Sequence, residues 1–165
     1  MRFGRERAKV GAVLALLAVL HFGLRPLLGA ERVAPDLLLL ALLVYAIRAR
    51  PGNGAIAGFA VGLLADSLSP AAFGAGALAH TTIGYFAAWG KAVFFADNLV
   101  VNAAFFFFGA WARDALVLLV GRHAEGSAAL WQIGWWSPLL ALTTALTGVI
   151  VLLVFRRWLH IRIGE

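Results

Sequence analysis

The sequence predicts an all-α membrane protein, a single bundle of six transmembrane helices with both termini in the cytoplasm. Hydrophobic residues make up 62% of the 165 residues and charged residues only 13%, with a mean hydropathy of +0.89, whereas soluble domains are about 45–50% apolar. Six apolar runs follow one another, and 165 residues can hold about six membrane-spanning helices at roughly 20 residues each. Residues 1–165 are therefore predicted to form one transmembrane domain, without a separate soluble domain.

The predicted spans cover about residues 8–28, 34–47, 53–68, 74–95, 98–120 and 136–155. The second and third spans are short for a full crossing. Three arrangements fit this shortness: packing without tilt in the middle of the bundle, a locally thinned bilayer, or a re-entrant pair joined by the sequence RARPGNG. The sequence does not choose among them.

Basic residues predict the orientation, because cytoplasmic loops carry an excess of Lys and Arg. Ten of these residues flank the spans on the side of the termini, three lie on the opposite side, and Arg113 lies inside the fifth span. The formal charge of +6 thus indicates topology and not nucleic acid binding. The first group is Arg2, Arg5, Arg7, Lys9, Arg48, Arg50, Lys91, Arg156, Arg157 and Arg162, and the second is Arg25, Arg32 and Arg122.

Glycines recur at every fourth position of the third span, and the same row ends in a carboxylate. Such a row lets another helix backbone come very near in a bilayer, so the third span is predicted to be the central, most crowded helix. A matching row of small residues on the fourth span makes that span the expected neighbour. The two rows, which can serve internal packing or partner binding, are Gly54, Gly58, Gly62 and Asp66, and Gly76, His80, Gly84 and Ala88.

Polar groups on five spans reach a similar depth, at a rise of about 1.5 Å per residue. We predict a buried or cavity-lining cluster centred on Asp66 and Arg113, with Asp114 turned about 100° away from Arg113 on its helix. Intramembrane charges usually face a partner or a wet cavity. A structural ion pair, an ion or proton path, a small-ligand cavity and a groove for a partner helix all remain open. The other members are His21, Asp36 and His80.

No catalytic, metal or cofactor motif is present in the sequence. The chain has no cysteine, which excludes disulfides and thiolate chemistry. The HExxH, G-x-S-x-G and phosphate-binding glycine-loop motifs are absent, and the four histidines have no ligand spacing. We expect a protein that is not an enzyme and holds no metal or cofactor.

From Pro35 to about Ala88 the chain resembles the rod shape-determining protein MreD family. The shared order is a Pro-Asp pair opening a leucine-rich helix, a short basic turn, a G-x-x-x-G helix ending in Asp, a glycine-bearing loop and a helix with Gly-Tyr. The resemblance carries over Asp36, Asp66, Gly58, Gly62 and Gly84 as family-typical positions, but not His80 or Arg113. It implies a fold similar to the substrate-binding membrane subunits of energy-coupling factor vitamin transporters.

The expected function is a multi-pass scaffold of the bacterial cytoplasmic membrane in the cell-elongation machinery. The resemblance implies an MreC-type bitopic protein as partner, together with the MreB filament and the synthases of the lateral wall. Anionic lipid head groups are simpler partners for the cytoplasmic basic residues. The alternative is a substrate-binding subunit of a vitamin transporter, which would need a pocket lined by several convergent polar groups.

Overall fold

The computed structural model describes residues 2–24, 27, 32–67, 73–94, 98–121 and 126–159, and all regular structure in these ranges is helical. Compared with the expected spans, the first helix already begins at residue 2, and the last helical stretch begins at residue 127, well before residue 136. The elements are α1 (Arg2–Leu24), α2 (Leu37–Ala46), α3 (Pro51–Asp66), α4 (Ala75–Phe94), α5 (Leu99–Gly121), α6 (Ser127–Trp131), the π-helical turn η3 (Gln132–Trp136) and α7 (Ser137–Leu159).

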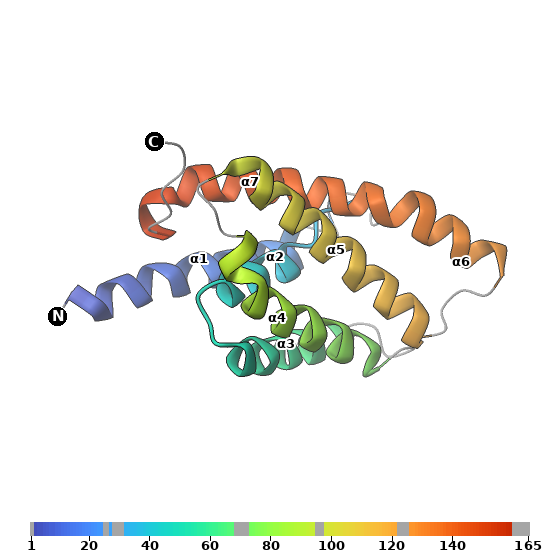
Figure 1. The fold of residues 1–165 in the computed structure, drawn as a ribbon, viewed down its shortest axis with the longest axis horizontal. Helices are drawn as coiled ribbons and strands as arrows, with labels where there is room; N and C mark the ends of the chain where they lie inside the picture. The colour runs from blue at the N-terminus through green and yellow to red at the C-terminus, as the bar shows by residue number, and fades with distance from the viewer. Residues whose placement is uncertain are drawn as a thin grey trace.

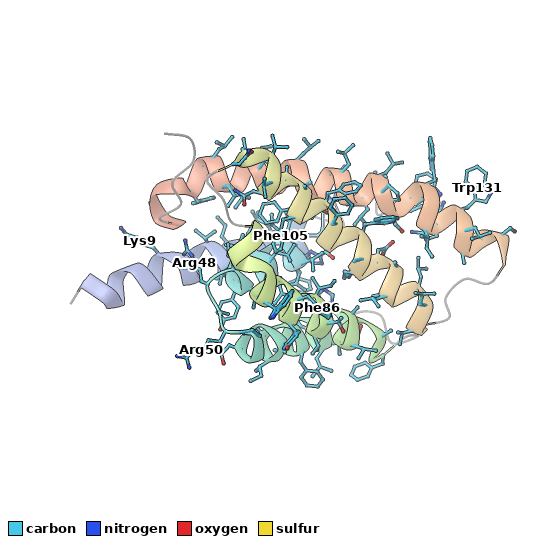
Figure 2. All side chains as sticks on the ribbon, viewed as in Figure 1. Lys9, Arg48, Arg50, Phe86, Phe105 and Trp131 are labelled. Carbon is cyan, nitrogen blue, oxygen red and sulfur yellow. The ribbon has the colours of Figure 1, made fainter. Side chains whose placement is uncertain are left out.

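The helices run back and forth along one long axis (Figure 1). The start of α1, the turn between α2 and α3, and the end of α7 lie at the same end of the molecule, while α6 lies at the opposite end. Lys9, Arg48 and Arg50 mark the first end and Trp131 the second (Figure 2). This arrangement agrees with an even number of passes between the two ends.

Helix α2 is the centre of the bundle. Nine of its ten residues are buried, and a helix that is hydrophobic all round is a buried one. The prediction that the third span is central is therefore wrong, because α3 buries only Gly54, Gly58, Gly62 and Asp66. At ten residues α2 rises only about 15 Å, half of a hydrocarbon core, which fits a short helix in the middle of the bundle.

Two helices among the described residues are long and apolar enough to cross a membrane, Leu99–Gly121 and Ser127–Phe155. The second contains η3, the widened turn that ends two residues before Pro138. A proline inside a helix lacks the N–H for the bond to the residue four positions back. The Ser137 hydroxyl bonds to the Gln132 carbonyl oxygen at 3.0 Å across this turn. The helix path therefore continues past Pro138 through a local π-turn.

Candidate functional site

The glycine row of α3 is buried against α4. A Cβ placed on Gly58 would lie 2.6 Å from the carbonyl carbon of His80, and one on Gly62 would lie 2.7 Å from the backbone nitrogen of Ala77. Real Cβ atoms do not come this close to backbone atoms. At Gly54 the close neighbours are again on α4. The row is consequently filled by α4, and no room remains there for a partner helix.

The α4 half of this contact also depends on glycine. A Cβ on Gly84 would lie 3.0 Å from the carbonyl carbon of Gly54, and one on Gly76 would lie 2.9 Å from the carboxyl carbon of Asp66. The two predicted rows therefore meet each other backbone to backbone, as the sequence suggests, and the small residues are what permit this approach.

Asp66 caps the beginning of α4. Its Oδ2 accepts hydrogen bonds from the backbone N–H groups of Gly74 at 2.8 Å and Ala77 at 2.9 Å, and its Oδ1 accepts one from Gly76 at 3.1 Å. The first N–H groups of a helix have no partner within the helix, and their partial positive charge favours a carboxylate. This explains why the glycine row ends in Asp66: the carboxylate joins the end of α3 to the start of α4.

Arg113, one of the two residues at the predicted centre of the cluster, pairs with Asp36 on α2 and not with Asp66. The distance from Arg113 Nη2 to Asp36 Oδ2 is 3.2 Å, and Arg113 Nη1 lies 3.7 Å from Asp114 Oδ1. Asp114 also accepts a short hydrogen bond from the Ser137 hydroxyl. The predicted centre of the cluster is therefore wrong, while Arg113, Asp36 and Asp114 do come together.

Asp36 connects the ion pair with Arg113 to three helices, α1, α2 and α7. Its Oδ1 caps α2 through the N–H of Leu39 at 2.9 Å and lies 3.5 Å from His21 Nδ1 on α1. The Asp36 N–H donates to Thr144 Oγ1 on α7 at 3.0 Å. The sequence does not indicate this threonine contact, because hydroxyls on helices most often bond to their own backbone. Thr144 does that too, donating to the Leu140 carbonyl oxygen at 2.8 Å.

The sequence of residues 8–158 matches the family model for the rod shape-determining protein MreD. This match covers most of the chain. The chain belongs to the MreD family. Members of the MreD family are membrane-associated proteins of rod-shape determination, and MreD is not a known enzyme family. No curated protein and no solved structure matches the chain.

In this MreD-family chain His80 is fully buried. Its Nδ1 lies 2.7 Å from the Gly76 carbonyl oxygen, and that carbonyl can only accept, so Nδ1 carries the proton. Asp36, Arg113 and Asp66 all act electrostatically on the ring. His80 Nε2 has no hydrogen-bond partner in the described part of the chain. The predicted cluster is thus two sites, the Asp36–Arg113 pair and the Asp66 cap, and His80 is bonded to Gly76, whose own N–H donates to Asp66.

An apolar groove of about 270 Å³ lies between α1, α2 and α3 of the MreD-family bundle. Only one lining side chain, Tyr45, carries a polar atom, so the groove offers few hydrogen bonds to a polar ligand. Within the described residues, no group of three His, Asp or Glu side chains is placed to hold a metal ion. The lining residues are Leu14, Ala18, Leu38, Ala41, Leu42, Tyr45, Ala57, Val61 and Leu64.

Proposed function

We propose that this chain is a non-enzymatic, multi-pass scaffold of the bacterial cytoplasmic membrane that binds an MreC-type bitopic protein within the cell-elongation machinery. Through that partner it would act with the MreB filament and the lateral-wall synthases. The observation that carries the proposal is the MreD-family match over residues 8–158. The orientation that we propose, with both termini in the cytoplasm, follows the distribution of basic residues.

The geometry supports a scaffold in a specific way. The three described acidic side chains, Asp36, Asp66 and Asp114, are all engaged with other parts of the same chain. Buried charges that satisfy one another hold their helices in fixed positions. The cluster therefore supports a rigid bundle that presents its outer faces to other proteins.

Large apolar side chains on those outer faces are available to a partner helix in the membrane. Tyr85, Phe86 and Trp89 of α4 are exposed, and Figure 2 shows Phe86 on the outside of this helix. Side chains such as these pack against lipid or against a partner helix. Because α4 fills the glycine row, a partner must bind to one of these outer surfaces.

The test is co-purification of the tagged chain with the MreC-type protein from the same source in mild detergent. An unrelated single-pass protein, expressed at the same level, is the control. We expect a stable complex with the MreC-type protein only. The chain should also restore rod shape to cells depleted of their own MreD protein.

Failure in both assays would contradict the scaffold proposal. Thermal stabilisation of the purified chain by a vitamin would then identify it as a transporter subunit.

A further inference from the structure

The groove between α1, α2 and α3 occupies a limited depth of the bundle. On α3 it extends from Ala57 to Leu64, and on α2 from Leu38 to Tyr45. Seven residues of helix rise about 10 Å. One leaflet of a bilayer contributes about half of the roughly 30 Å hydrocarbon core. The groove therefore matches the depth of a single leaflet.

Three exposed cations lie beyond one end of the groove. Arg48 follows the lining residue Tyr45 by three positions, and Lys9 precedes the lining residue Leu14 by five, about 7.5 Å of helix. Arg50 precedes α3 on the same turn as Arg48. Figure 2 shows these three side chains at the same end of the molecule. The positive-inside rule assigns that end to the cytoplasm.

These cations have no carboxylate to neutralise them among the described side chains. The acidic residues whose side chains the structure describes are Asp36, Asp66 and Asp114, and each is bound to partners elsewhere in the bundle. Asp36 and Asp66 lie at the opposite ends of α2 and α3 from Arg48 and Arg50. A positive end thus adjoins a groove that is almost purely apolar, and an anionic amphiphile complements both parts.

We propose that this groove binds one anionic phospholipid of the inner leaflet. Its acyl chain would lie along Leu14, Ala41, Ala57 and Val61. Its phosphate would lie near Arg48, Arg50 and Lys9. A spanning helix needs about 20 residues of contact depth, and the groove supplies only about two turns. An acyl chain of one leaflet fits this depth. The lipid would cover Leu14, Ala57 and Val61, which are only partly buried by the chain itself.

The test is native mass spectrometry of the delipidated chain, titrated with phosphatidylglycerol or phosphatidylethanolamine of the same acyl composition. We expect one phosphatidylglycerol per chain, bound at least tenfold more tightly than phosphatidylethanolamine. Ala57→Phe, which fills the groove, should weaken phosphatidylglycerol binding at least tenfold. The matched control is Ala60→Phe on the exposed face of the same helix, and it should bind like wild type.

Charge variants test the headgroup separately and leave the apolar core untouched. An anionic lipid gains about fivefold in affinity per nearby cation, so Arg48→Gln with Arg50→Gln should weaken phosphatidylglycerol about 30-fold. Binding of phosphatidylethanolamine should stay the same. Arg32→Gln removes an exposed cation at the other end, where Arg32 stacks on Trp136 at 5.3 Å, and should have no effect.

Equal binding of the two lipids by wild type would overturn the proposal, as would unchanged phosphatidylglycerol binding by Ala57→Phe. If Ala57→Phe instead abolishes co-purification of the MreC-type protein and leaves lipid binding intact, the groove holds the partner helix and the lipid proposal is wrong. If Ala57→Phe fails to fold, the charge variants alone test whether the groove binds an anionic lipid.

Discussion

Asp36 shows how one side chain can serve two structural purposes. One of its oxygens caps α2 at Leu39, and the other pairs with Arg113 at 3.2 Å. Asparagine also caps helices well, so Asp36→Asn keeps the cap and removes the charge that Arg113 requires. We expect this variant to lose about 3 kcal/mol of unfolding free energy, because Arg113 loses its closest charge partner and keeps only the longer contact with Asp114. Denaturation of the purified chain in micelles measures this loss.

The control for this variant is the double change Asp36→Asn with Arg113→Leu, which removes both charges. It should recover part of the lost stability, since Arg113 no longer stands as a charge without its closest partner, and only the longer contact of Arg113 with Asp114 is lost in addition. If the single and double variants are equally destabilised, the ion pair contributes nothing beyond packing.

Asp66 makes a different prediction at the same scale, because its carboxylate serves three backbone N–H groups of the α4 start. Asp66→Ala leaves all three without this acceptor, and loss of a cap costs about 0.5–2 kcal/mol. We expect a loss at the upper end of that range. Amide hydrogen exchange at Gly74 and Ala77 should become faster than in wild type.

Ser67→Ala is the matched control, because the exposed Ser67 hydroxyl donates to the Leu64 carbonyl oxygen of its own helix. Exchange at Gly74 and Ala77 should be unchanged in this variant. Unchanged exchange in Asp66→Ala as well would show that the carboxylate does not protect the start of α4.

At the scale of elements, the close contact of α3 with α4 is the feature that sequence spacing predicts best. Gly58→Ala must move the two backbones apart, because its Cβ would lie 2.6 Å from the His80 carbonyl carbon. Overpacking of this kind costs about 1–3 kcal/mol. The measurement is the thermal unfolding temperature in micelles, which should fall.

Gly11→Ala is the matched control, because here we expect the change in stability to be zero or favourable. Gly11 lies inside α1, and a Cβ there meets nothing within 4 Å. Alanine is a better helix former than glycine by about 1 kcal/mol, so this variant should be as stable as wild type or more stable. A fall in both variants would mean that glycine matters for a reason other than the helix contact.

For the whole molecule the orientation is open to a direct test, because the chain has no cysteine of its own. Asn53→Cys and Ser127→Cys each place one thiol at an exposed position, near opposite ends of the bundle. With the cation-bearing end in the cytoplasm, a membrane-impermeant maleimide added to intact cells should label Ser127→Cys and not Asn53→Cys. The reverse pattern would invert the topology, and labelling of both would contradict an intact membrane-spanning bundle.

The sequence alone was enough to predict a membrane protein from its composition, the positions of the main helices and the contact of α3 with α4. These properties are local: hydropathy and four-residue spacing on a helix depend only on the order of residues. The resemblance from Pro35 to Ala88 also identified the family correctly, as the match over residues 8–158 confirms.

The tertiary structure decided which helix is central and which charges meet. Spacing along a helix fixes the face and the depth of a side chain, but not which other helix lies opposite that face. Arg113 meets Asp36 because α2 packs antiparallel to α5, with Leu43 against Gly109 and Asp36 at the level of Arg113. Asp66 turns instead to the α4 start, where backbone N–H groups satisfy it locally. The apolar groove arises in the same way, from the positions of three helices that no single segment specifies.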